Sequence, residues 1–345
     1  RQKSNHPLLS VIVPVFNEEE ILETNLNKLQ DYLSALTESY SWEIIIVNDG
    51  SDDGTRDIAD QFASMYPEGV TVIHHFHNSH LGEALKSGLE VSAGDYVVTL
   101  DIDLSYSLDH IEKLLHALKS NHADIAVASP YMKGGRVINV PWTRRIVSRA
   151  VNLYMGFFSQ LQGHTFTSMV RAYRGEFIRS LNLKAYGYEV SPEILYKAFI
   201  LRAKVVEIPA TLKWSKKRQN SKSRKSLQRV IRGVLPGLMS GFMFRPYRFF
   251  LTIGTGLLFI AIYIVGWIFY HTFNQLQQIA IDPVATDRFS MAVAEVFSQR
   301  PYSFMVGGIV LIVALQFLSI GFLSLQNKRY FEEQFHLLTN LLKKH

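Results

Sequence analysis

Apolar residues recur along the first 130 positions in short runs that alternate with segments of helical periodicity. Residues 8–14 form a run that is apolar except for Ser10 and is typical of a buried strand, and residues 18–36 then place apolar side chains at helical spacing. Strands alternating with helices predict a parallel, doubly wound α/β sheet that is covered on both faces. The further predicted strands are residues 42–47, 70–74, 96–100 and 125–129, and the further predicted helices are residues 57–65, 80–91 and 108–119.

Two longer apolar segments, residues 249–273 and 304–326, lie near the end of the chain. A hydrocarbon core of about 30 Å takes about 20 helical residues to cross, and each segment is long enough. We therefore predict a hairpin of two transmembrane helices. The alternative is a buried helical hairpin in a soluble domain, which fits such uniformly apolar segments poorly.

Charged residues are distributed unevenly around these two apolar segments. Residues 213–248 contain many Lys and Arg and no Asp or Glu, and Lys328 and Arg329 follow the second segment, whereas residues 274–303 contain only Arg288 and Arg300 as cations. By the positive-inside rule, both ends of the hairpin are expected in the cytoplasm. The predicted organisation is a cytoplasmic catalytic domain at 1–214, a basic loop and membrane-interface helix at 215–248, spans at 249–273 and 304–326, an extracytoplasmic loop at 274–303 and a cytoplasmic tail at 327–345.

The net charge of +6 comes largely from this basic segment, which on its own would suit nucleic acid or an anionic membrane surface. Its position beside a span favours membrane lipid, so no nucleic-acid partner is expected. Residues 227–244 have the pattern of a helix in the membrane interface, and residues 142–161 fit either such a helix or an ordinary amphipathic core helix. The absence of cysteine excludes a disulfide framework and thiol chemistry. The sequence leaves a homo-oligomer open.

Carboxylates follow two of the predicted strands. Asp101 and Asp103 end the strand at 96–100, and Asp49 follows the strand at 42–47. Open α/β sheets bind ligands at the carboxyl ends of their strands, and a pair such as Asp101 and Asp103 can share one hard cation. That cation would neutralise a diphosphate, so nucleotide-sugar binding is the leading interpretation. The alternative is that these are solvated turn carboxylates, with Asp49 forming an Asp-Gly-Ser turn.

Three segments, PVFNEE at 14–19, VNDGSDDGT at 47–55 and DIDLS at 101–105, together resemble the family 2 inverting glycosyltransferases with a GT-A fold. Three further segments resemble the polyprenyl-phosphate branch of that family, which includes dolichyl-phosphate mannose synthase. They are HLGEALKSG at 80–88, TRRIVSR at 143–149 and TFTSMVRAY at 165–173. The resemblance covers roughly the first two thirds of the chain.

The resemblance implies an integral membrane hexosyltransferase that moves a sugar from a UDP- or GDP-linked donor to a polyprenyl (undecaprenyl or dolichyl) phosphate with inversion. It implies a Mg²⁺ or Mn²⁺ ion on Asp103, with Ser105 near the ion and Asp101 on the nucleotide or on a metal-bound water. The nucleotide would contact Pro14, Phe16, Glu18 and Asp49. Cations are expected to bind the clustered phosphates, because guanidinium groups suit phosphate oxygens. The candidates are Arg144, Arg171, Arg218 and Lys222.

Three positions depart from the branch: Pro130 stands in place of a usual Arg, Thr165 of a usual Asp and Met169 of a usual Gly. They point to an unusual sugar or acceptor, or to weakened activity. Alternative interpretations are a glycosyltransferase for another membrane lipid, such as a diacylglycerol, or a degenerate, non-catalytic membrane scaffold. A group of histidines, His74, His75, His77 and His80, is interpreted as solvated or packing side chains rather than as a metal cluster.

Overall fold

The computed structural model describes residues 6–142, 145–146, 148–150, 152–153, 163–214, 246–279 and 287–342. Internal contacts divide the chain into two compact units. One comprises Arg1–Phe244 with Phe335–His345, and the other is Arg245–Gln334.

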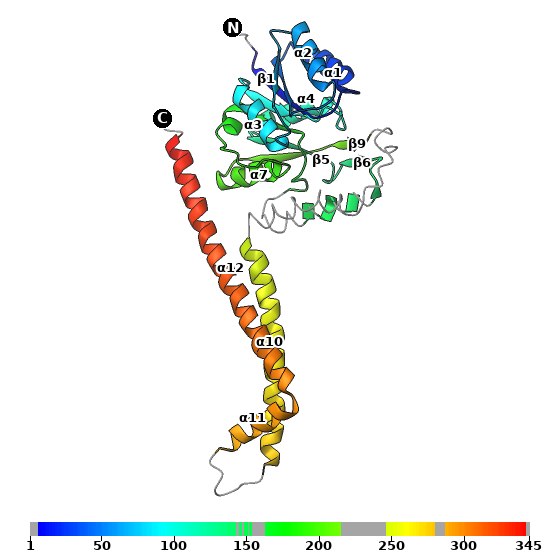
Figure 1. The fold of residues 1–345 in the computed structure, drawn as a ribbon. Helices are drawn as coiled ribbons and strands as arrows, with labels where there is room; N and C mark the ends of the chain where they lie inside the picture. Colours follow the sequence, from blue (N-terminus) through cyan, green and yellow to red (C-terminus); the bar gives the residue numbers. More distant parts are fainter. Residues whose placement is uncertain are drawn as a thin grey trace. The chain divides into compact units, whose positions relative to one another are not determined.

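The first unit is built on a mostly parallel sheet in the order β3-β2-β1-β4-β7-β5-β8. Strand β7 is antiparallel to both of its neighbours, β4 and β5, and the other pairs are parallel. The predicted GT-A-like sheet is confirmed (Figure 1). The strands are β1 (Leu8–Val15), β2 (Ser41–Asn48), β3 (Val70–His74), β4 (Tyr96–Thr99), β5 (Ile125–Ser129), β7 (Arg171–Arg174) and β8 (Val205–Pro209).

A small second sheet pairs β6 (Arg136–Ile138) in parallel with β9 (Thr211–Lys213). The hydrophobicity pattern did not predict β6, β7, β8 or β9. The strands that it did predict, β1 to β5, agree with the structure to within two residues at each end.

Helices cover both faces of the large sheet because its central strands carry apolar side chains on both sides. In β1, Val11 and Val13 point into one core and Ile12 into the other. The first core packs beneath α1 (Leu22–Ala35), α2 (Thr55–Met65) and α4 (Asp109–Ser120). The second packs beneath α3 (Leu81–Val91), α6 (Gly175–Arg179) and α7 (Val190–Ile200).

Helix α1 begins four residues later than predicted. Residue Asn17 has a left-handed φ of 54°, and the carbonyl of Glu18 accepts hydrogen bonds from the amides of Ile21 and Leu22. Residues 18–21 therefore form the turn that leads into the helix. Of the predicted helix at 142–161, the residues that the structure describes between 142 and 153 are helical, with Trp142 and Leu153 exposed. The predicted interface helix at 227–244 lies outside the described residues.

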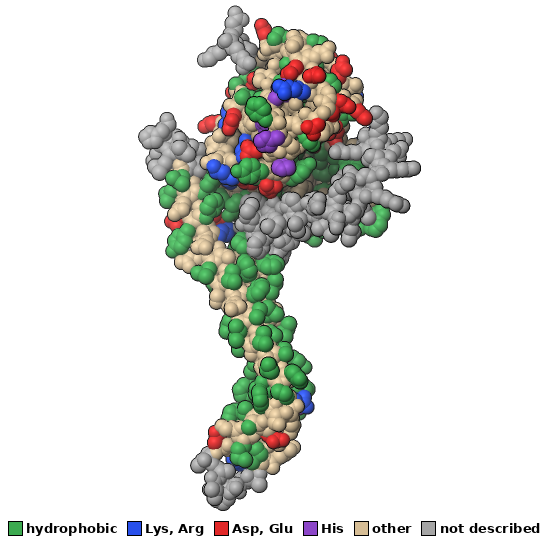
Figure 2. Space-filling model, in the orientation of Figure 1, with side chains coloured by type: hydrophobic (Ala, Val, Ile, Leu, Met, Phe, Trp, Pro, Cys, Tyr) green, Lys and Arg blue, Asp and Glu red, His purple; other side chains and the backbone are tan. Residues whose placement is uncertain are grey.

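The second unit contains α10 (Pro246–Gln278), α11 (Arg288–Gln299) and α12, which begins here and runs over Pro301–Leu342. Helices α10 and α12 pack antiparallel, since Gly254 lies against Leu318 and Gly321 against Leu251. Both helices are long and apolar enough to cross a membrane. Their apolar windows are only 11% and 17% buried, unlike a core helix of a soluble domain, and Figure 2 shows apolar side chains over their surface.

The expected loop at 274–303 contains a helix that the sequence did not predict, α11. Asp287 caps its N-terminus through hydrogen bonds from the amides of Phe289 and Ser290. The guanidinium of Arg288 donates to the carbonyl of Ile279, at 2.6 Å, beside the C-terminal end of α10. The expected tail at 327–345 is likewise helical as far as Leu342, because α12 continues through it without a break.

Candidate functional site

Three adjacent parallel strands end at one edge of the large sheet. Strand β1 lies between β2 and β4 and pairs in parallel with both, so their carboxyl ends meet. Phe16 follows β1, Asp49 follows β2 and Asp101 follows β4 closely. The structure therefore brings the nucleotide-site candidates to the same edge, where an open α/β sheet binds its ligands.

The loops after β1 and β2 are hydrogen-bonded to each other. The amide of Asn17 donates to the hydroxyl of Ser51 at 3.0 Å, and its side-chain oxygen accepts from the amide of Asp52 at 2.9 Å. The amide of Glu18 donates to the hydroxyl of Thr55 at 2.9 Å. This reciprocal bonding fixes Phe16 and Glu18 beside the loop that begins at Asp49.

Asp49 is nearly enclosed and is bonded on one oxygen. Its Oδ1 accepts a hydrogen bond from the amide of Ser79 at 2.9 Å and lies 2.8 Å from Nδ1 of His75. The other ring nitrogen of His75, Nε2, lies 2.9 Å from the hydroxyl of Ser87 on α3. Asp49 is therefore held by two residues of the loop between β3 and α3, one of which is supported from α3, rather than by its own turn.

Gly50 makes this arrangement possible. Its φ is +69°, a left-handed conformation that glycine adopts without strain. A Cβ at this position would lie 2.4 Å from the backbone carbon of His77. A side chain here would push the loop between β3 and α3 away, and with it the amide and imidazole that bind Asp49.

The Asp101–Asp103 pair is anchored through the residue between its members. Ile102 is buried in the first core, and its carbonyl accepts a hydrogen bond from the side-chain amide of Asn25 on α1 at 2.8 Å. Oδ1 of Asp103 accepts from the amide of Ser105 at 2.9 Å. Asp101 and Asp103 are both half-buried on either side of this anchor.

The segment after Asp103 is tied to the smaller sheet. Ser105 is buried, and its carbonyl accepts from the amide of Lys213 in β9 at 2.8 Å. Tyr106 forms a bridge to Leu212, and burial raises the pKa of its phenol far above the ordinary value, so the group stays neutral. Ser105 thus lies at the expected place beside Asp103, with its backbone fixed.

The structure corrects the expectation that Arg171 binds a phosphate. Its side chain is fully buried in β7, with Nη1 donating to the carbonyl of Ser191 and Nη2 to the carbonyl of Phe166, both at 2.8 Å. Burial lowers the pKa of its guanidinium, an effect that nearby Tyr173 opposes. The structure gives this arginine a role in holding the backbone together from within the core.

The other cationic candidates, Arg144, Arg218 and Lys222, lie outside the described residues. All three departures from the family pattern lie among the described residues, and Pro130 is buried directly after β5. The hydroxyl of Thr165 is buried 2.7 Å from that of Ser129, and its amide donates to Glu207 at 2.9 Å. Met169 is buried in the second core. Thr165 therefore lies where the usual carboxylate would lack solvent, and Met169 fills space in the second core with an apolar side chain.

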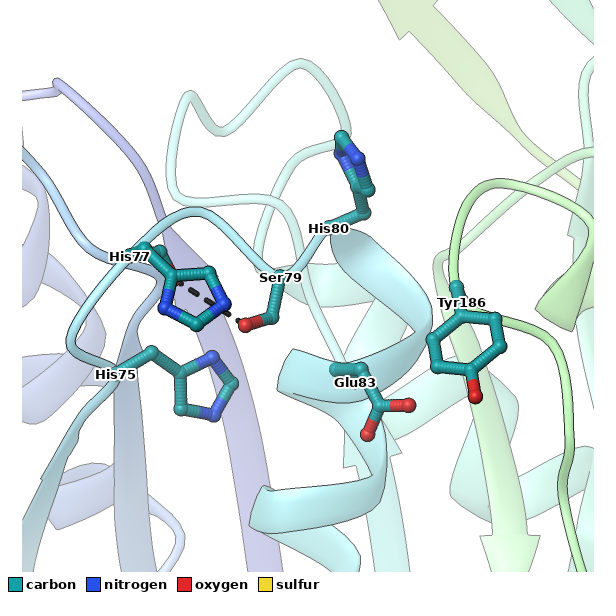
Figure 3. A pocket seen from close by; sticks show the side chains of 6 residues that line it. All are labelled: His75, His77, Ser79, His80, Glu83 and Tyr186. Carbon is teal, nitrogen blue, oxygen red and sulfur yellow. Dashed lines mark hydrogen bonds between the residues drawn. The ribbon is translucent and has the colours of Figure 1, made fainter.

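A surface pocket opens between the loop after β3 and the loop before α7 (Figure 3). The ring of Tyr186 lies on its far side (Figure 3), and the carbonyl of this residue accepts from the amide of Gly82 at 2.6 Å, at the start of α3. A Cβ on Gly82 would lie 2.3 Å from the carbonyl oxygen of Ala185, so this close approach needs glycine. The pocket is lined by His75, His77, Ser79, His80, Glu83 and Tyr186.

Sequence reasoning missed the contacts that two of the histidines between residues 74 and 80 make. His75 bonds to Asp49, and His74 lies 2.8 Å from Asp60 of α2 through its Nε2. The parallel pairing of β2 with β3 places Asn48 opposite His74, and hence Asp49 beside His75. The contact between Asp49 and His75 could have been predicted by pairing the ends of the two neighbouring strands, β2 and β3.

Comparison with known proteins gives a consistent result. The family model described as glycosyl transferase family 2 matches residues 10–181. A dolichol-phosphate mannosyltransferase from Pyrococcus furiosus is 34% identical over 206 residues, which are 59% of this chain and 56% of that protein. A polyprenol monophosphomannose synthase from Mycolicibacterium smegmatis is 32% identical over 207 residues, 58% of this chain and 76% of that protein.

An undecaprenyl-phosphate mannosyltransferase from Micrococcus luteus is 33% identical over 208 residues, which are 58% of this chain and 81% of that protein. The chain therefore spans little more than half of the Pyrococcus relative and most of the two bacterial ones. The matched region of residues 10–181 includes the β1, β2 and β4 strand ends described above.

Proposed function

The chain belongs to glycosyl transferase family 2, and on this premise we propose that it transfers a sugar from a nucleotide sugar to a polyprenyl phosphate at a membrane. The observation that carries the proposal is the meeting of Asp49, Asp101 and Asp103 at one edge of the sheet. The names of all three relatives support a polyprenyl-type acceptor, and they make mannose the first sugar to test.

The nucleotide would lie across the ends of β1 and β2. Asp49 accepts hydrogen bonds from its base or ribose, while Pro14 and Phe16 offer apolar contact from the end of β1. The loop of Glu18 is fixed to the loop of Asp49 by the bonds described above, so these groups form one wall. Asp101 would contact the nucleotide or a metal-bound water nearer the diphosphate.

The residues at the end of β4 fit a hard divalent cation. They offer carboxylate oxygens, which Mg²⁺ and Mn²⁺ prefer, on a segment anchored by Asn25. Within the described ranges, no group of three or more His, Cys, Asp and Glu side chains could enclose an ion. A site on Asp103 with Ser105 nearby would therefore take its remaining ligands from the donor phosphates and water, as Mg²⁺ sites commonly do. When bound, the ion would neutralise charge on the departing diphosphate.

The proposed reaction requires little proton transfer by the protein. A phosphate oxygen of the lipid attacks the anomeric carbon of the sugar and forms the new bond. The bond from that carbon to the nucleoside diphosphate breaks, and its electron pair leaves with the diphosphate, so the configuration inverts. Because the acceptor is already an anion, no strong general base is needed. The chain's residues must instead position two phosphate groups whose charges repel.

The direct test is to incubate the purified full chain with a panel of nucleotide sugars and with undecaprenyl or dolichyl phosphate. We expect release of nucleoside diphosphate with one donor, and a new sugar-bearing lipid phosphate. Diacylglycerol in place of the polyprenyl phosphate tests the alternative acceptor. If none of the nucleotide sugars in the panel releases nucleoside diphosphate, the non-catalytic scaffold is favoured.

The basic segment that contains Arg218 and Lys222 is proposed to bind the lipid phosphate and the donor diphosphate. The support is its position in the sequence, between the sheet domain and the first apolar helix, together with its lack of acidic residues. We expect Arg218→Ala with Lys222→Ala to lower transfer by at least about tenfold, because charge-assisted hydrogen bonds to phosphate contribute roughly 1.5–3 kcal/mol each. Transfer at the wild-type rate would limit this segment to a tether on anionic lipid.

Both ends of the helical hairpin are proposed to lie in the cytoplasm, from the asymmetry of Lys and Arg around the two spans. Single cysteines at Ser290 in α11 and Asn327 in α12 test this, since the chain has no native thiol. An impermeant maleimide added to intact cells should label position 290, and label position 327 only after permeabilisation. The reverse labelling pattern would refute the orientation.

A further inference from the structure

The contact between Asp49 and His75 is built into the sheet. Because β2 and β3 are parallel with Asn48 opposite His74, the next residue of each strand comes to lie at the same edge. Nδ1 of His75 is 2.8 Å from Oδ1 of Asp49, and the two side chains are only 15% and 6% exposed. A hydrogen bond so shielded from water is stronger and better fixed than one on the surface.

The partners of His75 determine where its proton lies. A carboxylate only accepts hydrogen bonds, so Nδ1 carries the hydrogen that points to Asp49. In the neutral ring Nε2 is then an acceptor, and the hydroxyl of Ser87 donates to it across 2.9 Å. The imidazole is therefore held on both sides, by Asp49 at the sheet edge and by Ser87 on α3.

The same bonds leave one oxygen of Asp49 for a ligand. Its Oδ1 receives both His75 and the amide of Ser79. Its Oδ2 accepts no hydrogen bond from any residue in the part of the chain that the structure describes. The carboxylate can therefore not rotate without losing two bonds, and Oδ2 is the acceptor it has left to offer.

We propose that His75, supported by Ser87, is a positioning residue that aims Oδ2 of Asp49 at a ring N–H of the donor's base. This inference rests on the proposed function, in which Asp49 binds the nucleotide. A fixed acceptor selects bases by their chemistry: uracil and guanine carry a ring N–H on the edge used for base pairing, whereas cytosine and adenine carry a bare ring nitrogen there. The ligand class is thus a nucleoside diphosphate of uracil or guanine.

The test measures binding of UDP, GDP, CDP and ADP to the full chain in detergent, with Mg²⁺ present, alongside donor kinetics. Wild type should bind UDP or GDP at least about tenfold more tightly than both CDP and ADP. His75→Phe removes the donor and should abolish this preference, raising KM for the nucleotide sugar about tenfold while changing kcat little. That split is expected because the base lies away from the reacting carbon.

His75→Asn supplies the rescue, since its amide nitrogen lies close to the place of Nδ1 and can still donate to Asp49. It should restore most of the base preference, and Ser87→Ala should weaken the preference less than His75→Phe does. His74→Phe is the matched control. It removes a neighbouring imidazole that is bonded to Asp60 and to the side-chain amide of Asn48 and leaves His75 and Ser79, the partners of Asp49, in place, so base preference should persist.

Two failures are distinguishable. If wild type binds UDP or GDP and transfers sugar, but His75→Phe keeps the wild-type preference and KM, the positioning role is overturned and the proposed function stands. If wild type binds CDP or ADP equally well, base selection by Asp49 is overturned. If wild type binds none of the four nucleoside diphosphates, and releases no nucleoside diphosphate from any nucleotide sugar, the proposed function itself has failed. Circular dichroism of each variant identifies any loss that comes from unfolding.

Discussion

Replacing Asp103 with alanine is expected to lower sugar transfer by about 10³-fold while the protein stays folded. The carboxylate is the best ligand for a divalent ion at the end of β4. Loss of the charge stabilisation that such an ion gives costs several kcal/mol. Each 1.36 kcal/mol added to the activation barrier lowers the rate about tenfold. The fold should survive because Asp103 is half-buried and the segment is anchored instead by Ile102 and Asn25. Transfer rate at saturating donor is the measurement.

A binding readout separates the metal role from a general loss of activity. Mn²⁺ should strengthen nucleoside diphosphate binding to wild type, and this increment should vanish in Asp103→Ala while metal-independent binding at Asp49 remains. The matched control is Asp109→Asn at the start of α4, which loses the charge that pairs with Lys113 and lies near His110, while its amide oxygen can still accept from the hydroxyl of Ser107. Full activity of Asp103→Ala, or of wild type in excess EDTA, would contradict the metal role.

How far the sequence predicts this fold depends on where apolar residues are continuous. Strands β1 to β5 are apolar runs and were located closely. Strand β7 was missed because it begins with Arg171 and ends with Arg174, a pattern typical of surface. Its place in the sheet comes from pairing with β4 and β5, which lie far back along the chain, and the carbonyls of Phe166 and Ser191 bind its guanidinium in the interior.

The candidate site likewise contains residues that the sequence predicted and residues that it did not. Asp49, Asp101 and Asp103 were predicted from strand ends, because parallel strands bring such ends together. The partners of Asp49 were not, since they depend on which strands are neighbours. His75 is 26 residues away in sequence and reaches Asp49 only because β3 pairs with β2. Arg171 shows the opposite error: a residue type suited to phosphate proved to be buried in the core, with Nη1 and Nη2 bonded to backbone carbonyls.

The second large effect is expected on stability, from a buried ion pair in α7. Glu193 and Lys197 are only 10% and 8% exposed, and their charged groups are in contact one helical turn apart. The carboxylate of Glu193 also accepts from the amides of Lys184 and Ala185, at 2.9 and 2.8 Å. This single side chain therefore pairs a buried cation and caps two backbone amides of the loop that leads to Tyr186.

Glu193→Leu should consequently destabilise the domain by about 3–5 kcal/mol, because it leaves the charge of Lys197 buried without its counter-charge. Adding Lys197→Met should recover part of that loss, since both charges are then replaced by apolar groups. The denaturation midpoints of the full-length chain in detergent, compared for wild type, single and double variants, measure both effects. A single variant as stable as wild type would contradict the role of the pair.

The same substitution reaches the candidate site through the backbone. The carbonyl of Tyr186 accepts from the amide of Gly82 at the start of α3, the helix that also carries Ser87. The double variant restores charge balance but leaves the amides of Lys184 and Ala185 without the carboxylate. It should therefore regain part of the lost stability yet still bind nucleoside diphosphate more weakly than wild type. Recovery of both properties together would show that Glu193 acts on the fold alone, and that the loop at Tyr186 is held independently of it.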